Sequence, residues 1–268
     1  MLFDFRFRPI EQVGAWGTPP DLSLSWFGLT DGYYRLQVGS ENLFAYTEQI
    51  SKHWATNDPA FSGASVDYYV VRLWEDVCAI LPDVMEPIPS DFLRLVSGRN
   101  PAIRQVLQTV GTWWQGLADD EMAGENEEIY YAAITWASSR NLDSLYLRGG
   151  PRIWIFSHDD TVTIAWDNRG LEIDGIEVWS ARCGSYSMSR SKFLEEIRSF
   201  DRRLLAQMQE RVDQVCADWR RPEIHIDFEQ LRIEQIERGQ TLPLALRASP
   251  TSVDWERVQA ALRKVANF

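Results

Sequence analysis

The sequence predicts an α+β fold, in which antiparallel hairpins pack against amphipathic helices. Two observations support this prediction: apolar residues alternate with polar ones in three segments that each contain a turn dipeptide, and they recur every three or four residues in several longer segments. The expected order is an N-terminal hairpin, a helical middle, a three-hairpin antiparallel sheet, and a long helix near residues 190–219 that packs across the sheet.

The first predicted hairpin follows a short strand at residues 3–7, where three phenylalanines share one face. Its turn is placed at Asp31-Gly32, because two central residues that tolerate positive φ are what a type I′ turn needs. Residues 26–30 and 33–38 then form the two strands. Alternation assigns one face to the core, namely Phe27, Leu29, Tyr34, Leu36 and Val38.

The other face of this hairpin is a candidate binding surface. It carries Trp26, Tyr33 and Arg35, and these three residue types are the usual anchors of protein interfaces. The alternative is a face half covered by another layer, with Arg35 stacked on Trp26 or Tyr33 as a cation–π pair.

Helical periodicity runs through the middle of the chain and returns near its end. Residues 65–81 form an amphipathic helix that Pro82 stops, and a short helix follows at residues 91–96. Asn100 as N-cap and Pro101 in the first turn begin a helix that runs to about residue 117. Further helices are predicted at residues 129–140, 190–219 and 227–239, and Thr251 or Ser252 caps a last one.

Residues 119–128 hold six carboxylates. We interpret this run as a solvated loop whose last carboxylates lie in the first turn of the next helix, where the helix dipole favours negative charge. The alternative is a patch that binds a cation or a partner.

Two more hairpins are predicted in the second half of the chain. One turns at Asp159-Asp160, and its two apolar faces indicate strands that are covered on both sides. The other turns at Asp174-Gly175, which places Glu172 directly opposite Glu177. The faces of the first are Ile153, Ile155, Val162, Ile164 and Trp166 on one side and Trp154, Phe156, Thr163 and Ala165 on the other.

The opposed glutamates need an explanation, because like charges across a hairpin are destabilising. The favoured explanation is a neighbouring cation, either Arg169 or Arg182. The alternative is a carboxylate group that shares a proton or holds a cation, as acid–base enzymes require. Asp167 is close in sequence, so Asp167, Glu172 and Glu177 are the catalytic candidates.

Composition limits the classes of function. The net charge is −12, which repels the phosphate backbone and disfavours nucleic-acid binding, whereas a basic partner is the better match. No apolar run fits a signal peptide or a membrane span, and three widely spaced cysteines indicate reduced thiols. We therefore expect a cytosolic protein that binds neither membranes nor nucleic acids.

Motifs for catalysis and cofactor binding are missing from the sequence. It contains no G-x-S-x-G elbow, no phosphate-binding loop and no dinucleotide-binding glycine pattern, and its three histidines are isolated. No CxxC or HxxxH spacing occurs. The sequence therefore predicts no cofactor and no metal site.

Six short motifs identify a family resemblance. The chain resembles a bacterial family of uncharacterised proteins that is frequent in actinobacteria and proteobacteria. The resemblance runs nearly end to end, and it implies a single cytosolic unit without assigned catalytic residues. The motifs are FRPI at 7–10, SWFGLTDGYY at 25–34, RLWEDV at 72–77, WDN at 166–168, IDGIEVW at 173–179 and FDRRLLAQM at 200–208.

Residues 1–268 are thus predicted to form one α+β domain, with the Pro-rich segment 82–90 as the point where two lobes, 1–89 and 90–268, would divide. Two functions follow. The first is an interaction protein that neutralises a protein partner, in the manner of bacterial immunity proteins. The second is a hydrolase-type enzyme that uses the carboxylates at Asp167, Glu172 and Glu177.

Overall fold

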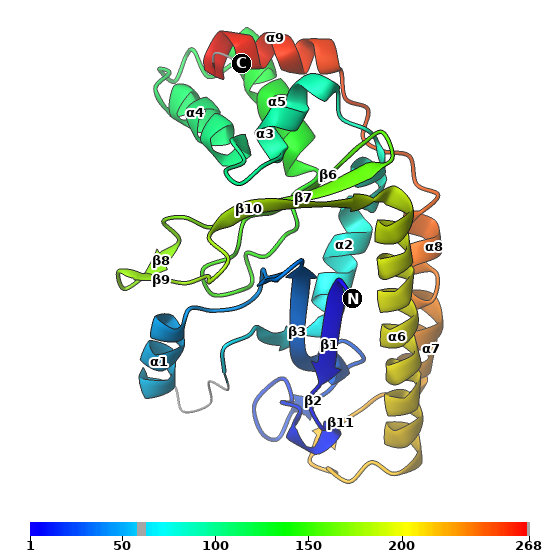
Figure 1. The fold of residues 1–268 in the computed structure, drawn as a ribbon. Coiled ribbons are helices and arrows are strands. Elements are labelled where there is room, and N and C mark those ends of the chain that lie inside the picture. Colours follow the sequence, from blue (N-terminus) through cyan, green and yellow to red (C-terminus); the bar gives the residue numbers. More distant parts are fainter. Residues whose placement is uncertain (58–62, 267–268) are drawn as a thin grey trace.

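The computed structural model describes residues 1–57 and 63–266, and it confirms the α+β class (Figure 1). Two antiparallel sheets lie one above the other, and helices cover the outer face of the upper sheet and the side of both. Within the described residues, no helix is long and apolar enough to cross a membrane. All three cysteines are free thiols.

The upper sheet has the strand order β10-β7-β6, built from β6 (Ile153–His158), β7 (Thr161–Asp167) and β10 (Cys183–Ser189). The hairpin at Asp159-Asp160 is confirmed, with Asp159 in the left-handed region at φ 48. Both faces are buried as predicted. Ile155 and Ile164 pack into the larger of two apolar cores, and Trp154 and Phe156 pack into the smaller one.

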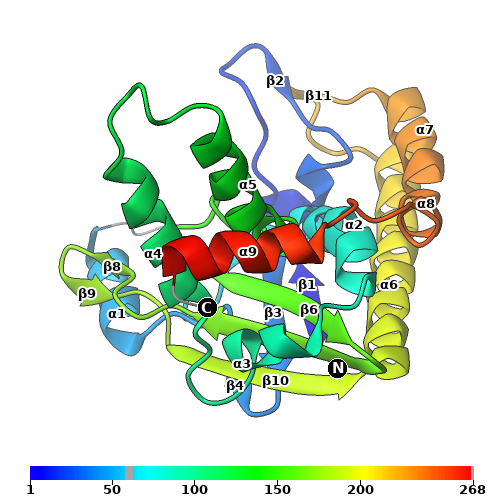
Figure 2. The same cartoon turned by 90° about the horizontal axis from the view of Figure 1, so that it is seen from above.

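The smaller core lies under a layer of helices. α3 (Leu93–Val96), α4 (Ile103–Gln115), α5 (Glu125–Ser138) and α9 (Trp255–Ala266) cover the upper sheet, as Figure 2 shows from above. Trp136 is fully buried at the centre, with its ring 5.5 Å from that of Phe156 and 4.9 Å from that of Phe92. Edge-to-face and tilted contacts between aromatic rings therefore join the helices to the sheet.

The lower sheet corrects the first predicted hairpin. Asp31-Gly32 is not a turn, because β3 (Asp31–Val38) runs through it and Gly28–Thr30 is a 3₁₀ turn. The partner of β3 is β1 (Phe3–Phe7), with β4 (Glu41–Asn42) and β5 (Asp67–Tyr69) also paired to it. Alternation within β3 is as predicted, with Tyr34, Leu36 and Val38 buried.

Gly32 explains why the Asp31-Gly32 dipeptide led to the wrong prediction of a turn. A Cβ at this position would lie 2.4 Å from the carbonyl oxygen of Arg6 and 2.9 Å from the Cα of Phe7. Glycine is therefore required for the close approach of β1 and not for a turn. Asp31 is the first residue of β3, and its carboxylate accepts a hydrogen bond of 2.9 Å from Arg8 Nε.

The predicted helix at 65–81 is shifted. Residues 67–69 belong to β5, and α2 (Val70–Met85) continues through Pro82 for three more residues. Proline keeps a helical φ, so the helix can continue past it, but the missing N–H of Pro82 costs one hydrogen bond of the helix. The short helix at 91–96 is confirmed as η3 (Ser90–Phe92) followed by α3.

The long helix is confirmed as α6 (Arg190–Ala217), with Ser189 as N-cap. It runs beside both sheets (Figure 1). It contacts β1 and the residue before it. Phe200 stacks on Phe3 at 5.1 Å, and Glu196 accepts a hydrogen bond of 2.7 Å from the Leu2 amide. α6 therefore fixes the upper sheet relative to the lower one.

The remaining helices and strands agree only in part with the predictions. α7 (Phe228–Arg238) has the predicted N-cap Asp227. The caps of two other helices differ from prediction, since α4 starts after Ala102 and the Asp254 side chain caps α9. Further features that were not predicted are α1 (Glu48–Asn57), α8 (Thr241–Ala245), η1 (Ile10–Gln12) and the parallel pairing of β2 (Leu22–Ser23) with β11 (Ile224–His225).

The third hairpin, β8 (Glu172–Ile173) and β9 (Ile176–Glu177), is present with its predicted turn and register. It forms a small sheet of its own, so the expected three-hairpin sheet is wrong. The physical reason is a different partner, because β9 bonds to the segment before α1, where the Thr47 hydroxyl donates to the Glu177 carbonyl oxygen at 2.6 Å.

We predict that Gly32→Ala destabilises the fold by about 1–3 kcal/mol, because the added methyl group collides with the backbone of β1. Urea unfolding measures the effect. Gly111→Ala is the matched control, since this glycine lies inside α4 with no atom near its Cβ position, and alanine there should stabilise by about 0.5–1 kcal/mol. Equal stability of Gly32→Ala and the parent would contradict the β1–β3 register.

Candidate functional site

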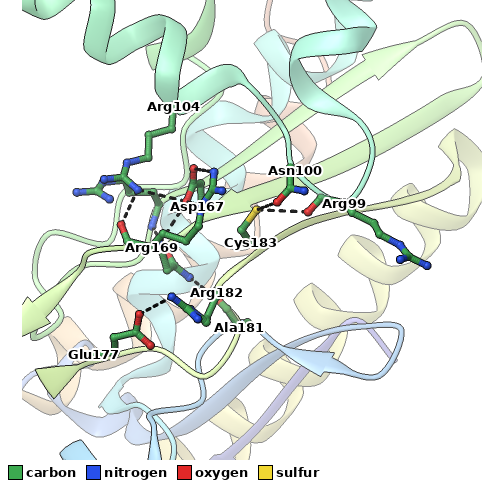
Figure 3. A network of polar contacts seen from close by, with 11 residues as sticks. Arg99, Asn100, Arg104, Asp167, Arg169, Glu177, Ala181, Arg182 and Cys183 are labelled. Carbon is green, nitrogen blue, oxygen red and sulfur yellow. Dashed lines mark hydrogen bonds and ion pairs between the residues drawn. The ribbon is translucent and has the colours of Figure 1, made fainter.

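The candidate site lies at the end of the upper sheet where β7 stops and β6 and β10 start. Asp167 is the last residue of β7, Arg152 precedes β6, and Cys183 is the first residue of β10. Arg104 reaches this end from the first turn of α4 (Figure 3). Residues far apart in the chain therefore meet around one buried carboxylate.

Asp167 is held as an ion by two arginines. Its side chain is 2% exposed, and its oxygens accept hydrogen bonds from Arg169 Nε at 2.9 Å and Arg169 Nη2 at 2.7 Å. Arg104 Nη1 lies 3.3 Å from Oδ1. Burial alone would raise the pKa of Asp167, but the hydrogen bonds from Arg169 and the charges of both arginines hold that pKa below its ordinary value.

Glu172 and Glu177 stand directly opposite each other, as predicted. A neighbouring cation offsets their repulsion, as the favoured explanation predicted, because Arg182 Nη2 lies 2.7 Å from the Glu177 carboxylate. The other candidate cation, Arg169, is paired with Asp167. Glu172 is exposed. In Figure 3, Glu177 faces Arg182, and Asp167 faces Arg169 and Arg104. Asp167 and Glu177 are thus each paired with a different arginine.

Positive charge exceeds negative charge around Asp167. We call Arg104, Arg152 and Arg169 the arginine cluster. Arg104 Nε and Arg152 Nη1 are buried and have no hydrogen-bond partner within the described part of the chain. Burial lowers the pKa of Arg152, and repulsion from Arg104 lowers it further despite the attraction of Asp167. The guanidinium groups of Arg104 and Arg152 are therefore close enough to repel each other.

Cys183 lies at the same strand end and was not predicted as a site residue. Its Sγ donates to the carbonyl oxygen of Arg99 at 3.3 Å and lies 3.4 Å from Asn100 Oδ1. Burial raises the pKa of the Cys183 thiol, and the neighbouring arginines do not reverse this shift. Cys183 is therefore a protonated thiol and not an activated nucleophile.

The three aromatic-surface candidates are separated. Trp26 is fully buried, and its Nε1 donates to Gln235 Oε1 at 2.8 Å, so it lies in the core and not on the predicted outward face. Tyr33 and Arg35 do share a face of β3 and line one surface pocket. The cation–π contacts of the Tyr33 ring come from Arg6 and Arg8 and not from Arg35, the predicted partner. The Arg6 and Arg8 guanidinium groups lie 5.5 Å and 5.1 Å from the ring centroid.

Sequence reasoning also missed a buried acid. Asp76 on α2 is 6% exposed, accepts a hydrogen bond of 2.8 Å from the Tyr146 hydroxyl, and lies 3.3 Å from Arg72 Nε. Burial raises the pKa of Asp76 to about 7 despite both contacts. The signal was available in the RLWEDV segment, where Arg72 and Asp76 are one helical turn apart.

A further surface feature lies on α7, outside α6 (Figure 1). Ile233 and Ile236 are 42% and 73% exposed, and Leu244 on α8 is 63% exposed. Glu229 and Glu237, also exposed, lie one turn before and one turn after Ile233. We call these five residues the α7–α8 face.

Fold and site together define an α+β protein with an arginine cluster at a sheet end and an apolar, acid-flanked helical face. The chain belongs to a family of unknown function, DUF5984, whose model matches residues 2–261. This confirms the predicted resemblance to an uncharacterised family. No curated protein and no solved structure matches the chain.

The raised pKa of Asp76 makes a prediction about stability. The folded chain keeps a proton on Asp76 up to about pH 7, whereas the ordinary value is 3.8. This contribution to stability is fully present at low pH and is lost as the pH rises through about 7. The stability of the parent relative to Asp76→Asn should therefore fall between about pH 4 and about pH 7, by at most about 1.4 kcal/mol per pH unit, and should level off above that range.

Urea unfolding of both chains at several pH values measures this difference. Asp120→Asn, at an exposed loop position, is the control and should show no such trend relative to the parent. A constant difference between the parent and Asp76→Asn across this range would contradict the protonated, buried state of Asp76.

Proposed function

We propose that this chain is a cytosolic bacterial binding protein that occupies and neutralises a basic protein partner, in the manner of an immunity protein. The observation that supports the proposal is the α7–α8 face. The free cysteines fit a reducing compartment, and the net charge of −12 fits a basic partner.

The inner side of α7 already accounts for the stability of this helix. Leu231 is 2% exposed, Gln235 bonds to Trp26 and to the Leu205 carbonyl oxygen, and Arg238 pairs with Glu75 at 2.6 Å. The outward isoleucines therefore add little to folding. Adjacent exposed apolar residues on a fixed helix are a feature of interaction sites.

The charges beside the isoleucines favour one class of partner. An apolar centre with a polar rim is the usual anatomy of an interface, and here the exposed rim contains Glu229 and Glu237, with Arg232 as one opposing charge. A helix or loop with apolar anchors and flanking lysines or arginines would complement it. Such charges mainly accelerate association and exclude acidic partners.

The hydrolase hypothesis has less support. A general acid must carry a proton at the working pH, whereas arginine contacts lower the pKa of Asp167. Glu177 is paired with Arg182, and Glu172 is exposed on a two-residue strand. These contacts favour a structural role for the carboxylates and leave binding as the better-supported function.

We predict that Ile236→Asp abolishes partner capture without loss of stability, because this side chain is 73% exposed. The parent chain, immobilised, is used to isolate proteins from a lysate of the source organism. The captured protein is then purified and its affinity measured directly. A centrally placed apolar anchor lost from an interface should lower affinity at least about tenfold.

Leu145→Asp is the matched control, since Leu145 is 90% exposed and lies outside α7 and α8. It should bind like the parent. The proposal is supported if the captured protein is basic, binds when purified, and loses affinity only for Ile236→Asp. It is contradicted if no protein is captured reproducibly, or if the captured protein is acidic or binds both variants equally.

A further inference from the structure

We propose that the arginine cluster, Arg104, Arg152 and Arg169, is a binding site for a phosphate group. The ligand class is inorganic phosphate or the phosphate monoester of a small molecule. This inference does not depend on the α7–α8 face or on the nature of a protein partner.

The first argument is local charge. Three guanidinium groups gather around one carboxylate, Asp167, which leaves two positive charges without a paired carboxylate among the described residues, in a chain whose net charge is −12. Glu177 does not compensate them, because it is paired with Arg182. A dianion would balance the cluster, which matches the charge of a phosphate group near neutral pH.

The second argument is the unused donors. Arg104 Nε and Arg152 Nη1 are both buried without an acceptor among the described residues. An unpaired buried donor is unfavourable, and more so when it belongs to a charged group. The two side chains come from different elements, since Arg104 starts α4 and Arg152 precedes β6. An oxyanion that reached either donor would satisfy it.

The third argument is the start of α4. Within the part of the chain that the structure describes, no side chain caps the start of this 13-residue helix, and its first turn holds Arg104. A cation in the first turn opposes the helix dipole, so the arrangement is unfavourable in the free chain. An anion beside Arg104 would interact favourably with both the dipole and the guanidinium group.

The surroundings favour binding over phosphoryl transfer. Asp167 is saturated by arginine contacts and therefore cannot donate a proton, and Cys183 is held as a thiol by its contact with the Arg99 carbonyl oxygen. Arg104 is already positioned by a hydrogen bond of 2.5 Å to the Arg169 carbonyl oxygen. The cluster is thus arranged before any ligand arrives, which favours affinity.

The experiment titrates the full chain with inorganic phosphate and, in a separate arm, with glycerol phosphate. Chloride at equal ionic strength is the reference in both arms. Calorimetry gives the affinity, and the NMR signal of the Arg104 Nε–H group reports whether the ligand reaches this donor. We expect saturable binding in at least one arm, with a shift of that signal.

Arg152→Gln is the main variant, because the buried Arg152 Nη1 has no hydrogen-bond partner among the described residues and removal of the guanidinium group relieves repulsion from Arg104. Its thermal midpoint in chloride should be equal to or higher than that of the parent, while its phosphate affinity falls at least about tenfold. A purely structural role for Arg152 would lower the midpoint instead. Arg247→Gln, at an exposed position after α8, is the control and should bind like the parent.

Binding in the glycerol phosphate arm alone assigns the site to phosphate monoesters, and binding in both arms assigns it to the phosphate group itself. The proposal is overturned if the parent binds neither probe, if the Arg104 Nε–H signal stays unchanged at saturation, or if Arg152→Gln binds with the affinity of the parent.

Discussion

Burial of both faces of the β6–β7 hairpin is the constraint on which the rest of the structure depends. Ile155 and Ile164 face the larger core, and Trp154 and Phe156 face the smaller one, so this hairpin joins the helical layer to the lower sheet. Strands that are covered on both sides cannot place charged groups along their length. The charged residues therefore gather where the strands end.

The end of β7 shows what this constraint produces. Asn168 follows Asp167 and bonds to the Arg152 amide and the Ala181 carbonyl oxygen, each at 2.8 Å, so the three chain segments at this end are fixed together. Arg104 then adds α4 to the same group. The result is a rigid cluster of guanidinium groups around one carboxylate, which is suited to holding an anion and poorly suited to moving a proton.

Local patterns in the sequence were sufficient to predict part of the fold and part of the candidate site. The two faces of β6–β7, the opposed Glu172 and Glu177, and α6 all follow from periodicity and turn residues within one segment. The hairpin at Asp31-Gly32 failed because glycine serves turns and close backbone contacts alike, and only pairing with β1 distinguishes them. The arginine cluster was not predicted because its members meet only through tertiary structure, with Arg104 and Asp167 separated by 63 residues.

Amide hydrogen exchange under native conditions tests the central claim most directly, because it reports which hydrogen bonds open only when the whole chain unfolds. The Ile155 amide bonds to the Arg140 carbonyl oxygen outside the hairpin, so by alternation Phe156 and Thr163 are a hydrogen-bonded pair of β6 and β7. If the doubly buried hairpin holds the fold together, the amides of Phe156 and Thr163 should exchange only through global unfolding and should share its free energy. Exchange of these amides through local opening, at free energies no higher than those of α7, would contradict the account.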